Sequence, residues 1–194
     1  MPSKIILIQG HPDRDGARLC RHLADAYAEG ARDGGHELRR IDLAALDFPL
    51  LSSQHAYEHE PIPPGLAGAV EDLLWADHIV LVFPLWLGTM PALVKAFLEQ
   101  VLRPGGAFVF PEKGGPQSLM AGRTARLVVT MGMPTLLYRF WFGGHGLKVI
   151  RRNILAFIGI RVVRQSLFGL VTNATPDKVR GWLDEMRRAG RAAR

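Results

Sequence analysis

Short apolar runs alternate with polar and glycine-rich segments along this 194-residue chain. The runs at 4–9 and 77–84 are almost wholly apolar, as in strands that are covered on both faces of a sheet. Segments 126–131 and 162–170 predict two further strands. A weaker strand is expected at 37–43, where charged residues indicate a position near the edge. The pattern therefore predicts five strands.

Helical periodicity fills most of the segments between these runs. Helices are expected at 19–31, 65–75, 91–102 and 147–157 and from 176 onward. Thr175, Pro176 and Asp177 form the N-cap, the first helical position and a first-turn acid of the last helix. Two stretches lack periodicity: 47–64, which carries four prolines, and the glycine-rich 105–122. Both are expected to be irregular, the first as a long surface loop.

Strict alternation of strands and helices indicates a parallel sheet with helices on both faces. With five strands, we expect a three-layer flavodoxin-like α/β fold with the strand order 2-1-3-4-5, and one domain over residues 1–194. Ligands in such sheets bind beyond the carboxyl ends of the strands, where the strand order reverses. That rule selects the loops at 10–18, 84–90 and 130–135.

Composition narrows the class of protein. Hydrophobic residues at 48% and charged residues at 22% are typical of a soluble globular chain and exclude disorder. The net charge is +6, and part of the basic excess lies at the end of the last helix, in Arg187, Arg188, Arg191 and Arg194. No nucleic-acid motif accompanies this charge, so we expect no nucleic-acid partner.

The single cysteine, Cys20, allows no internal disulfide and is expected to be a small buried hydrophobe. No run reaches the length of about 18 apolar residues that a membrane span requires. The chain enters a strand within a few residues of its start, without a basic and then apolar leader. A cytoplasmic location is therefore expected.

The loop at 10–18 reads GHPDRDGAR and opens a helix. Free backbone N–H groups at a helix N-terminus suit a phosphate or pyrophosphate. His11 can donate a hydrogen bond to a phosphate oxygen, and Arg14 or Arg18 can pair with its charge. A solvated turn with incidental charges explains the same residues, so this loop alone leaves both interpretations open.

The loop after the third strand, 77–84, is apolar where a solvated turn would be polar. It contains Pro84, Leu85, Trp86, Leu87, Gly88 and Thr89. A planar ligand would account for this apolarity, with the backbone N–H groups of 86–89 donating to its polar edge. Packing of Trp86 and Leu87 in a core or a subunit interface is the alternative.

The next loop, at Thr130, Met131 and Gly132, has a glycine that lets backbone approach a ring closely. The Thr130 hydroxyl can hydrogen-bond the edge of such a ring. Glycine before a helix is common, so this loop supports the same interpretation only together with the others.

Aromatic residues crowd the segment LLYRFWFGGHG at 136–146, as in a substrate wall or a dimer surface. Its His145 can polarise a bound carbonyl, although a loop histidine is often incidental. Other chemistries lack their motifs: GxGxxG after the first strand, a P-loop, HExxH, GxSxG and paired CxxC are all absent. No metal site is expected.

These loops together resemble the flavodoxin-like NAD(P)H:quinone oxidoreductase family, which includes the ancillary proteins of glutathione-gated potassium efflux. The resemblance covers essentially the whole chain. It is most specific in FPLWLGTMPALVKAFLEQVLRPGGAFVF at 83–110, and RRNILAFIGIRVV at 151–163 is also similar to the family. It implies a flavin, FMN or FAD, and NAD(P)H as the electron donor.

The resemblance also implies roles for individual residues. The flavin phosphate would lie against His11, Gly16, Ala17 and Arg18. The isoalloxazine ring would contact 84–89 and 130–132. Tyr138 and His145 would be the catalytic groups beside the hydride-transfer face, and Phe108, Phe110 and Trp141 would line the substrate pocket. Phe108 and Phe110 would do so in the partner subunit, because the family is typically dimeric with sites at the interface.

The implied reaction is a ping-pong cycle in which hydride passes from NAD(P)H to flavin N5 and then to a quinone or similar acceptor. One departure concerns the phosphate loop: the family usually has serine, phenylalanine and asparagine where this chain has Gly16, Ala17 and Arg18. That difference leaves FMN and FAD both open.

Two other functions stay open. A flavodoxin-like electron carrier is one, although such carriers tend to be acidic and this chain carries a net charge of +6. A nucleotide-sensing regulatory subunit of a potassium-efflux system, acting as a peripheral partner of a membrane transporter, is the other.

Overall fold

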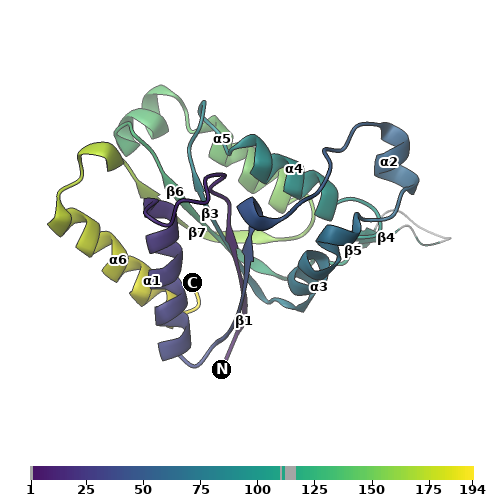
Figure 1. Cartoon of the computed structure of the whole chain (residues 1–194), viewed down its shortest axis with the longest axis horizontal. Helices are drawn as coiled ribbons and strands as arrows, with labels where there is room; N and C mark the ends of the chain where they lie inside the picture. Colours follow the sequence, from purple (N-terminus) through teal and green to yellow (C-terminus); the bar gives the residue numbers. More distant parts are fainter. Residues whose placement is uncertain (1, 110, 112–116) are drawn as a thin grey trace.

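The sheet at the centre of the molecule has five parallel strands in the order β2-β1-β3-β6-β7 (Figure 1). The computed structural model describes residues 2–109, 111 and 117–194. The strands are β1 (Lys4–Gln9), β2 (Glu37–Asp42), β3 (His78–Pro84), β6 (Thr124–Thr130) and β7 (Arg161–Phe168). Counted within this sheet, their order is the predicted 2-1-3-4-5, and the predicted flavodoxin-like fold class is confirmed.

Helices cover both faces of the sheet. The helices α1 (Leu19–Asp33) and α6 (Pro176–Arg191) pack side by side on one face. The other face carries α3 (Ala67–Trp75), α4 (Ala92–Val101) and the segment α5 (His145–Lys148) with η4 (Val149–Leu155). No helix in the part of the chain that the structure describes combines the length and the apolarity needed to cross a membrane.

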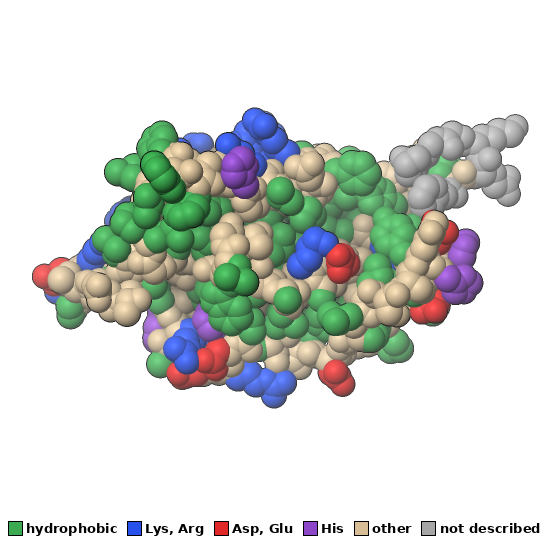
Figure 2. Space-filling model, turned by 90° about the horizontal axis from the view of Figure 1, so that it is seen from above, with side chains coloured by type: hydrophobic (Ala, Val, Ile, Leu, Met, Phe, Trp, Pro, Cys, Tyr) green, Lys and Arg blue, Asp and Glu red, His purple; other side chains and the backbone are tan. Residues whose placement is uncertain are grey.

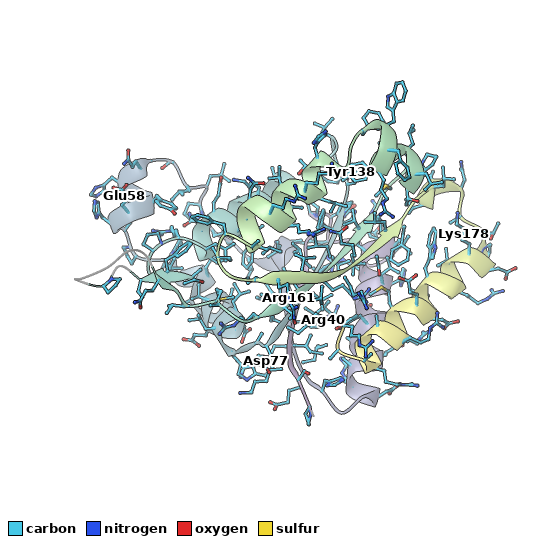
Figure 3. All side chains as sticks on the ribbon, turned by 180° about the vertical axis from the view of Figure 1, so that it is seen from behind. Arg40, Glu58, Asp77, Tyr138, Arg161 and Lys178 are labelled. Atoms are coloured by element: carbon cyan, nitrogen blue, oxygen red, sulfur yellow. The ribbon has the colours of Figure 1, made fainter. Side chains whose placement is uncertain are left out.

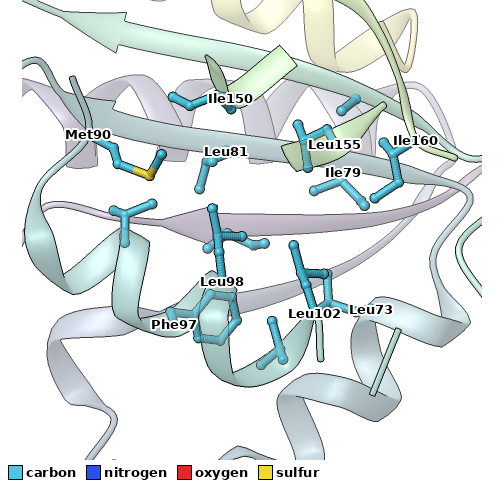
Figure 4. Close-up of a cluster of buried hydrophobic side chains, with 14 of the residues drawn as sticks. Leu73, Ile79, Leu81, Met90, Phe97, Leu98, Leu102, Ile150, Leu155 and Ile160 are labelled. Atoms are coloured by element: carbon cyan, nitrogen blue, oxygen red, sulfur yellow. The ribbon is translucent and has the colours of Figure 1, made fainter. Parts of the chain in front are cut away.

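The strand β3 explains why both layers are needed. All seven of its residues are buried, and their side chains alternate between the two faces. Ile79 and Leu81 join the cluster under α4 and η4, whereas Val80 and Val82 join the cluster under α1 and α6. Figure 4 shows Ile79 and Leu81 among the side chains of α4 and η4. A strand of this kind is stable only in the middle of a covered sheet.

The two edges of the sheet are more polar. In β2 the side chains of Glu37, Arg39 and Arg40 are exposed, which confirms the expected edge position. At the opposite edge, β7 also exposes part of its length. The capping of α6 agrees with the expectation too, because the Thr175 hydroxyl accepts a hydrogen bond from the Lys178 amide at 3.3 Å.

The segment 47–64 contains a helix that its sequence pattern does not indicate. The helix α2 (Gln54–His59) begins at Ser53, whose hydroxyl accepts a hydrogen bond from the Ala56 amide at 3.0 Å. With six residues it is too short to show a periodicity. The prediction of a loop without secondary structure was therefore wrong here.

A buried arginine holds this segment in place. Arg103 is 2% exposed and donates hydrogen bonds to the carbonyl oxygens of Ala56 (2.6 Å), Glu60 (2.7 Å) and Pro61 (2.8 Å). Its Nε also donates to Gln100 at 3.2 Å. These three backbone carbonyl groups thus accept hydrogen bonds from a charged side chain that follows the end of α4.

Two further segments differ from their predicted form. The stretch 105–122 includes a small antiparallel pair, β4 (Phe108–Val109) with β5 (Gln117–Ser118). The helix expected at 147–157 begins earlier, at His145, and continues as a π-helix over Val149–Leu155. A second π-helical segment, η3 (Leu137–Trp141), precedes it. π-Helical turns are rare and lie frequently at functional sites.

Replacing Arg103 with methionine should lower the free energy of unfolding by about 3 kcal/mol, because three backbone carbonyls lose a charged hydrogen-bond donor that is itself buried. Arg180→Met is the matched control, since Arg180 is an exposed arginine on α6, paired only with Asp177 one turn away; it should change the free energy by no more than about 0.5 kcal/mol. Urea unfolding of both variants measures the difference. Equal, small effects would show that Arg103 does not hold the segment.

Candidate functional site

A hollow of about 470 Å³ lies where β1, β3 and β6 end, at the reversal of strand order. This volume is within the range of small-molecule sites, roughly 300–1,000 Å³. The three loops selected from the sequence meet here, together with the start of α1. The predicted residues that line it are His11, Ala17, Arg18, Pro84, Leu85, Trp86, Thr130, Met131 and Gly132.

The loop after β3 forms a tight two-residue turn. The Trp86 amide donates to the Thr89 carbonyl at 2.9 Å, and the Thr89 amide donates to the Trp86 carbonyl at 3.0 Å. Leu87 and Gly88 between them have φ values of 48° and 83°, as in a type I′ turn. The predicted donors at this loop are therefore reduced to two, because only the Leu87 and Gly88 amides have no acceptor among the described residues.

Leu87 is in a strained and exposed conformation. A positive φ is an outlier for leucine, whose Cβ crowds the backbone there. Its side chain is fully exposed, and that of Trp86 is about half exposed at 48%. Strain of this kind persists where the surrounding structure enforces it, and it is found at ligand sites.

Tyr138 supports this turn from behind. Its hydroxyl donates to the Gly88 carbonyl at 3.1 Å and accepts from the Leu147 amide at 3.2 Å. The side chain is 1% exposed, and burial raises its pKa. Figure 3 places it on the helical segment at the end of the molecule where the strands finish. In this structure the hydroxyl holds the turn and does not line the hollow.

Gly146 packs against the same turn. A Cβ at this position would lie 2.2 Å from the Gly88 carbonyl oxygen and 2.8 Å from the Thr89 Cα. Any larger residue would push α5 away from the turn. The conformation of residues 86–89 is thus determined jointly by a hydrogen-bonding tyrosine and by a glycine that permits close approach.

The loop after β1 is organised around His11. Its Nδ1 accepts a hydrogen bond from the Asp13 amide at 3.1 Å, so the proton of the neutral ring is on Nε2. The imidazole packs edge-on against Trp86, with ring centroids 5.9 Å apart. Burial lowers its pKa from the ordinary value, although the Asp13 carboxylate opposes this effect. His11 is therefore a neutral donor at the edge of the hollow.

Arg18 is less available than its charge implies. Its guanidinium pairs with Asp13 at 2.5 Å and lies 3.7 Å from Asp15. A hydrogen bond from the Asp15 amide, together with Arg18, lowers the pKa of the Asp13 carboxyl. Arg14 donates instead to the Ala44 carbonyl at 2.7 Å, away from the hollow. The acidic and basic side chains of the loop at 10–18 thus largely neutralise one another.

The first turn of α1 presents free donors to the hollow. Arg18 at the N-cap makes no side-chain cap, and the amides of Leu19 and Cys20 have no acceptor among the described residues. Four N–H groups are left without partners at any helix N-terminus, and an anion satisfies them well. This geometry suits a phosphate group even without the hydroxyl side chains that are usual in the family.

The floor of the hollow is formed at the ends of β6 and α1. Thr130 Oγ1 and Cys20 Sγ are 3.2 Å apart, and burial raises the pKa of the Cys20 thiol to about 11. The cysteine is thus buried, as expected, and a raised pKa favours the protonated thiol. Gly132 is different, because a Cβ there would meet no heavy atom within 4 Å. The space beside it is open to a ligand.

Several predicted residues lie outside this hollow. His145 is exposed at the start of α5, Trp141 is 81% exposed, and neither lines it. Phe108 is buried against Phe157, at 5.8 Å between ring centroids, in a different part of the molecule. Phe110 lies outside the described residues. Four further predicted residues are close to the hollow in sequence but do not line it: Gly16, Leu87, Gly88 and Thr89.

The sequence interpretation missed Val171 and Thr172, which close the hollow from the loop after β7. The same rule that selected the other loops applies to the end of this strand. It also missed Gly146, for which the only signal is the pair of glycines flanking His145.

Leu87→Asn should raise the free energy of unfolding by about 1 kcal/mol, because asparagine adopts positive φ at lower cost and Asn-Gly is the preferred type I′ pair. Leu50→Asn is the control, since Leu50 is also exposed (71%) and is not among the positive-φ residues; it should have little effect. Urea unfolding without added ligand measures both. If Leu87→Asn destabilises the protein, the turn is not strained.

This chain is similar in sequence to proteins that are named as oxidoreductases. An FMN-dependent NADH:quinone oxidoreductase of Ruegeria pomeroyi is 28% identical over 146 residues, which are 68% of this chain and 71% of that protein. A protein of Haemophilus influenzae, named as an uncharacterized NAD(P)H oxidoreductase, is 26% identical and covers 93% of this chain and 90% of its own.

Solved structures show the same fold. An NAD(P)H:quinone oxidoreductase from Methanothermobacter marburgensis superposes with a TM-score of 0.80 at 22% identity, over the whole of both chains. A family model described as the flavodoxin-like fold matches residues 3–188. This chain therefore belongs to that flavodoxin-like family.

Proposed function

We propose that this chain is a flavin-dependent NAD(P)H oxidoreductase that reduces a quinone or a similar small acceptor. One observation carries the proposal: three separate loops and a helix N-terminus converge on one hollow, with a strained apolar turn at its rim. The names of the relatives from Ruegeria pomeroyi and Methanothermobacter marburgensis support this activity and this acceptor class.

Residues that line the hollow, together with the turn at its rim, fit a flavin at both ends. The free amides of Leu19 and Cys20, with His11 beside them, suit the phosphate. The Leu87 and Gly88 amides and the open space at Gly132 suit the polar edge and the face of the isoalloxazine ring. FMN is the form in the name of the Ruegeria pomeroyi relative, and it is our first choice over FAD.

When bound, the flavin supplies the hydride-transfer chemistry, and the protein supplies position and electrostatics. The donated N–H groups of Leu87 and Gly88 would stabilise negative charge at the polar edge of the ring. The apolar side chains of Trp86 and Leu87 would exclude water from one side. NAD(P)H and the acceptor would then use the remaining open face in turn.

Tyr138 acts in this proposal as a positioning residue. Because its hydroxyl is engaged by Gly88 and Leu147, it holds the turn that carries the N–H donors. Phe108 lies away from the chain's own hollow, so its predicted substrate contact would be made in the site of a partner subunit. The predicted substrate contact of Trp141 stays a prediction. A homodimer with shared sites remains a prediction, and so does a catalytic role for His145.

Absorbance spectra of the purified protein, before and after FMN or FAD is added, test the proposal directly. A bound flavin and oxidation of NADH or NADPH that depends on a quinone are expected. The proposal fails if neither flavin binds at micromolar concentrations, or if the loaded protein oxidises neither nucleotide.

Gly132→Ala should weaken flavin binding roughly tenfold or more, since overfilling a close contact costs about 1–3 kcal/mol. Stability without flavin should be unchanged, because the added methyl meets no protein atom. Gly181→Ala on α6, where a Cβ also meets nothing, is the matched control and should bind flavin normally. Fluorescence titration measures the affinities. Equal affinities for both variants would exclude contact between the ring and Gly132.

The pKa of His11 should rise when FMN binds, because a phosphate dianion beside Nε2 favours the imidazolium form. It starts below the ordinary value, so the ring takes up a proton only at lower pH in the flavin-free protein. Proton NMR of the histidine C2–H resonances, assigned with His11→Gln, measures the shift. Riboflavin, which lacks the phosphate, should leave this pKa nearly unchanged; an equal rise with both ligands would place the phosphate elsewhere.

A further inference from the structure

An exposed aromatic ridge stands beside the candidate site. We call the five apolar residues that form it the aromatic crest: Leu136, Leu137, Phe140, Trp141 and Phe142. Phe140 is 78% exposed and Trp141 is 81% exposed. The crest lies on η3, which projects at the upper end of the molecule ahead of α5 in Figure 1. Soluble monomers rarely leave such a contiguous apolar group in water without a function.

Basic side chains border the crest. A hollow of about 280 Å³ next to it is lined by Arg139, Lys148, Arg151 and Arg152, and Phe140 of the crest lines the same hollow. All four basic residues are exposed, and none forms an ion pair with a described residue. Figure 2, seen from the side where the strands end, shows hydrophobic side chains gathered on one part of this face, with Lys and Arg beside them.

The charge around the crest is of one sign. No aspartate or glutamate occurs between Glu112 and Asp177, whereas this stretch contains many of the chain's lysines and arginines. On α6, by contrast, Arg187 pairs with Glu29 at 2.9 Å and Arg191 pairs with Asp33 at 3.2 Å. Four basic residues without an ion-pair partner among the described residues therefore lie beside the crest, whereas two of the arginines at the C-terminal end are paired.

We infer that the crest and its basic border dock the protein on the surface of an anionic phospholipid bilayer. Aromatic and aliphatic side chains of the crest would enter the interface, where tryptophan is favoured. The four basic residues would face the phosphate groups of the lipids. An anionic bilayer offers an apolar layer and anionic groups at adjacent depths, which matches the crest and its basic border.

Charge complementarity favours a bilayer over a second copy of this chain. A twofold contact that covers the crest and its border would enclose Arg139, Lys148, Arg151 and Arg152 of both copies in one interface. No acidic residue of that segment is present to compensate them. Like charges at a desolvated contact are destabilising, whereas anionic lipids neutralise all of them.

Docking would place the candidate site at the membrane surface. The residue between the crest and the site is Tyr138, which lies on η3 and contacts the Gly88 turn. An acceptor dissolved in the bilayer, such as a hydrophobic quinone, could then reach the hollow without crossing water. This consequence rests on the proposed function, but docking itself requires neither flavin nor NAD(P)H, so the two proposals can fail separately.

Flotation with vesicles tests the docking. The full chain is mixed with vesicles of phosphatidylcholine alone or with 30% phosphatidylserine, with and without FMN. Binding is expected only to the anionic vesicles, and 0.5 M NaCl should weaken it. Emission of Trp141 should shift to the blue on binding, and this shift should be absent in Trp141→Phe.

Two double variants that each lose two positive charges show whether the position of those charges matters for vesicle binding. Arg151→Gln with Arg152→Gln should weaken vesicle binding about 25-fold, or about fivefold for each charge. Arg32→Gln with Arg188→Gln removes two exposed charges from the ends of α1 and α6, away from the crest, and should have little effect. Circular dichroism confirms that both variants are folded.

The inference is overturned by any of three results. Equal binding to neutral and anionic vesicles, or no binding, would exclude electrostatic docking. Equal losses in the two double variants would show a general effect of net charge. Binding of free inorganic phosphate at the hollow without vesicle binding, or conversion of a dimer to a monomer by Trp141→Ser, would assign the surface to a small anion or to a second copy.

Discussion

The fold depends on a single requirement, that β3 be buried on both faces. Its seven residues contain no exposed side chain, so helices must cover the sheet on each side, and each connection must cross from one end of the sheet to the other. Every strand then ends at the same edge. The hollow lies there because β1 and β3 are neighbours in the sheet while their connections run to opposite faces.

The turn after β3 shows how the remaining structure supports this site. Leu87 has a backbone conformation that leucine avoids, and it has no contact with the protein that would explain it. Tyr138 and Gly146 hold the turn from a segment that begins 50 residues after Gly88 in the chain. The Tyr138 hydroxyl, whose action on an acceptor stays a prediction, is hydrogen-bonded to this turn and to the Leu147 amide. Tyr138 also lies on η3, so the same residue connects the turn and the crest.

The structure places the paired and unpaired charges differently from what we expected from the sequence. Arg18 appeared to be a phosphate ligand, yet Asp13 and Asp15 neutralise much of its charge. The donors that remain at the phosphate end are backbone amides and His11, whose ring burial keeps neutral. Four exposed basic residues that have no ion-pair partner among the described residues lie instead beside the crest. A site that would bind a phosphate through backbone amides needs few basic side chains of its own. The unpaired basic residues beside the crest are therefore free to contact another partner.

The sequence by itself determined the strands, their order and the loops that form the hollow, because a buried strand must be an apolar run and parallel strands end together. It also identified Gly132 and the apolar 84–89 turn. Only the tertiary structure decided which groups are still free to act: the amides of Leu87 and Gly88 are available, whereas the hydroxyl of Tyr138 is not. It alone revealed α2, since Arg103 stabilises that helix from far along the chain. The physical reason is the same in each case, because hydrogen bonds between distant segments leave no periodic signal in either segment.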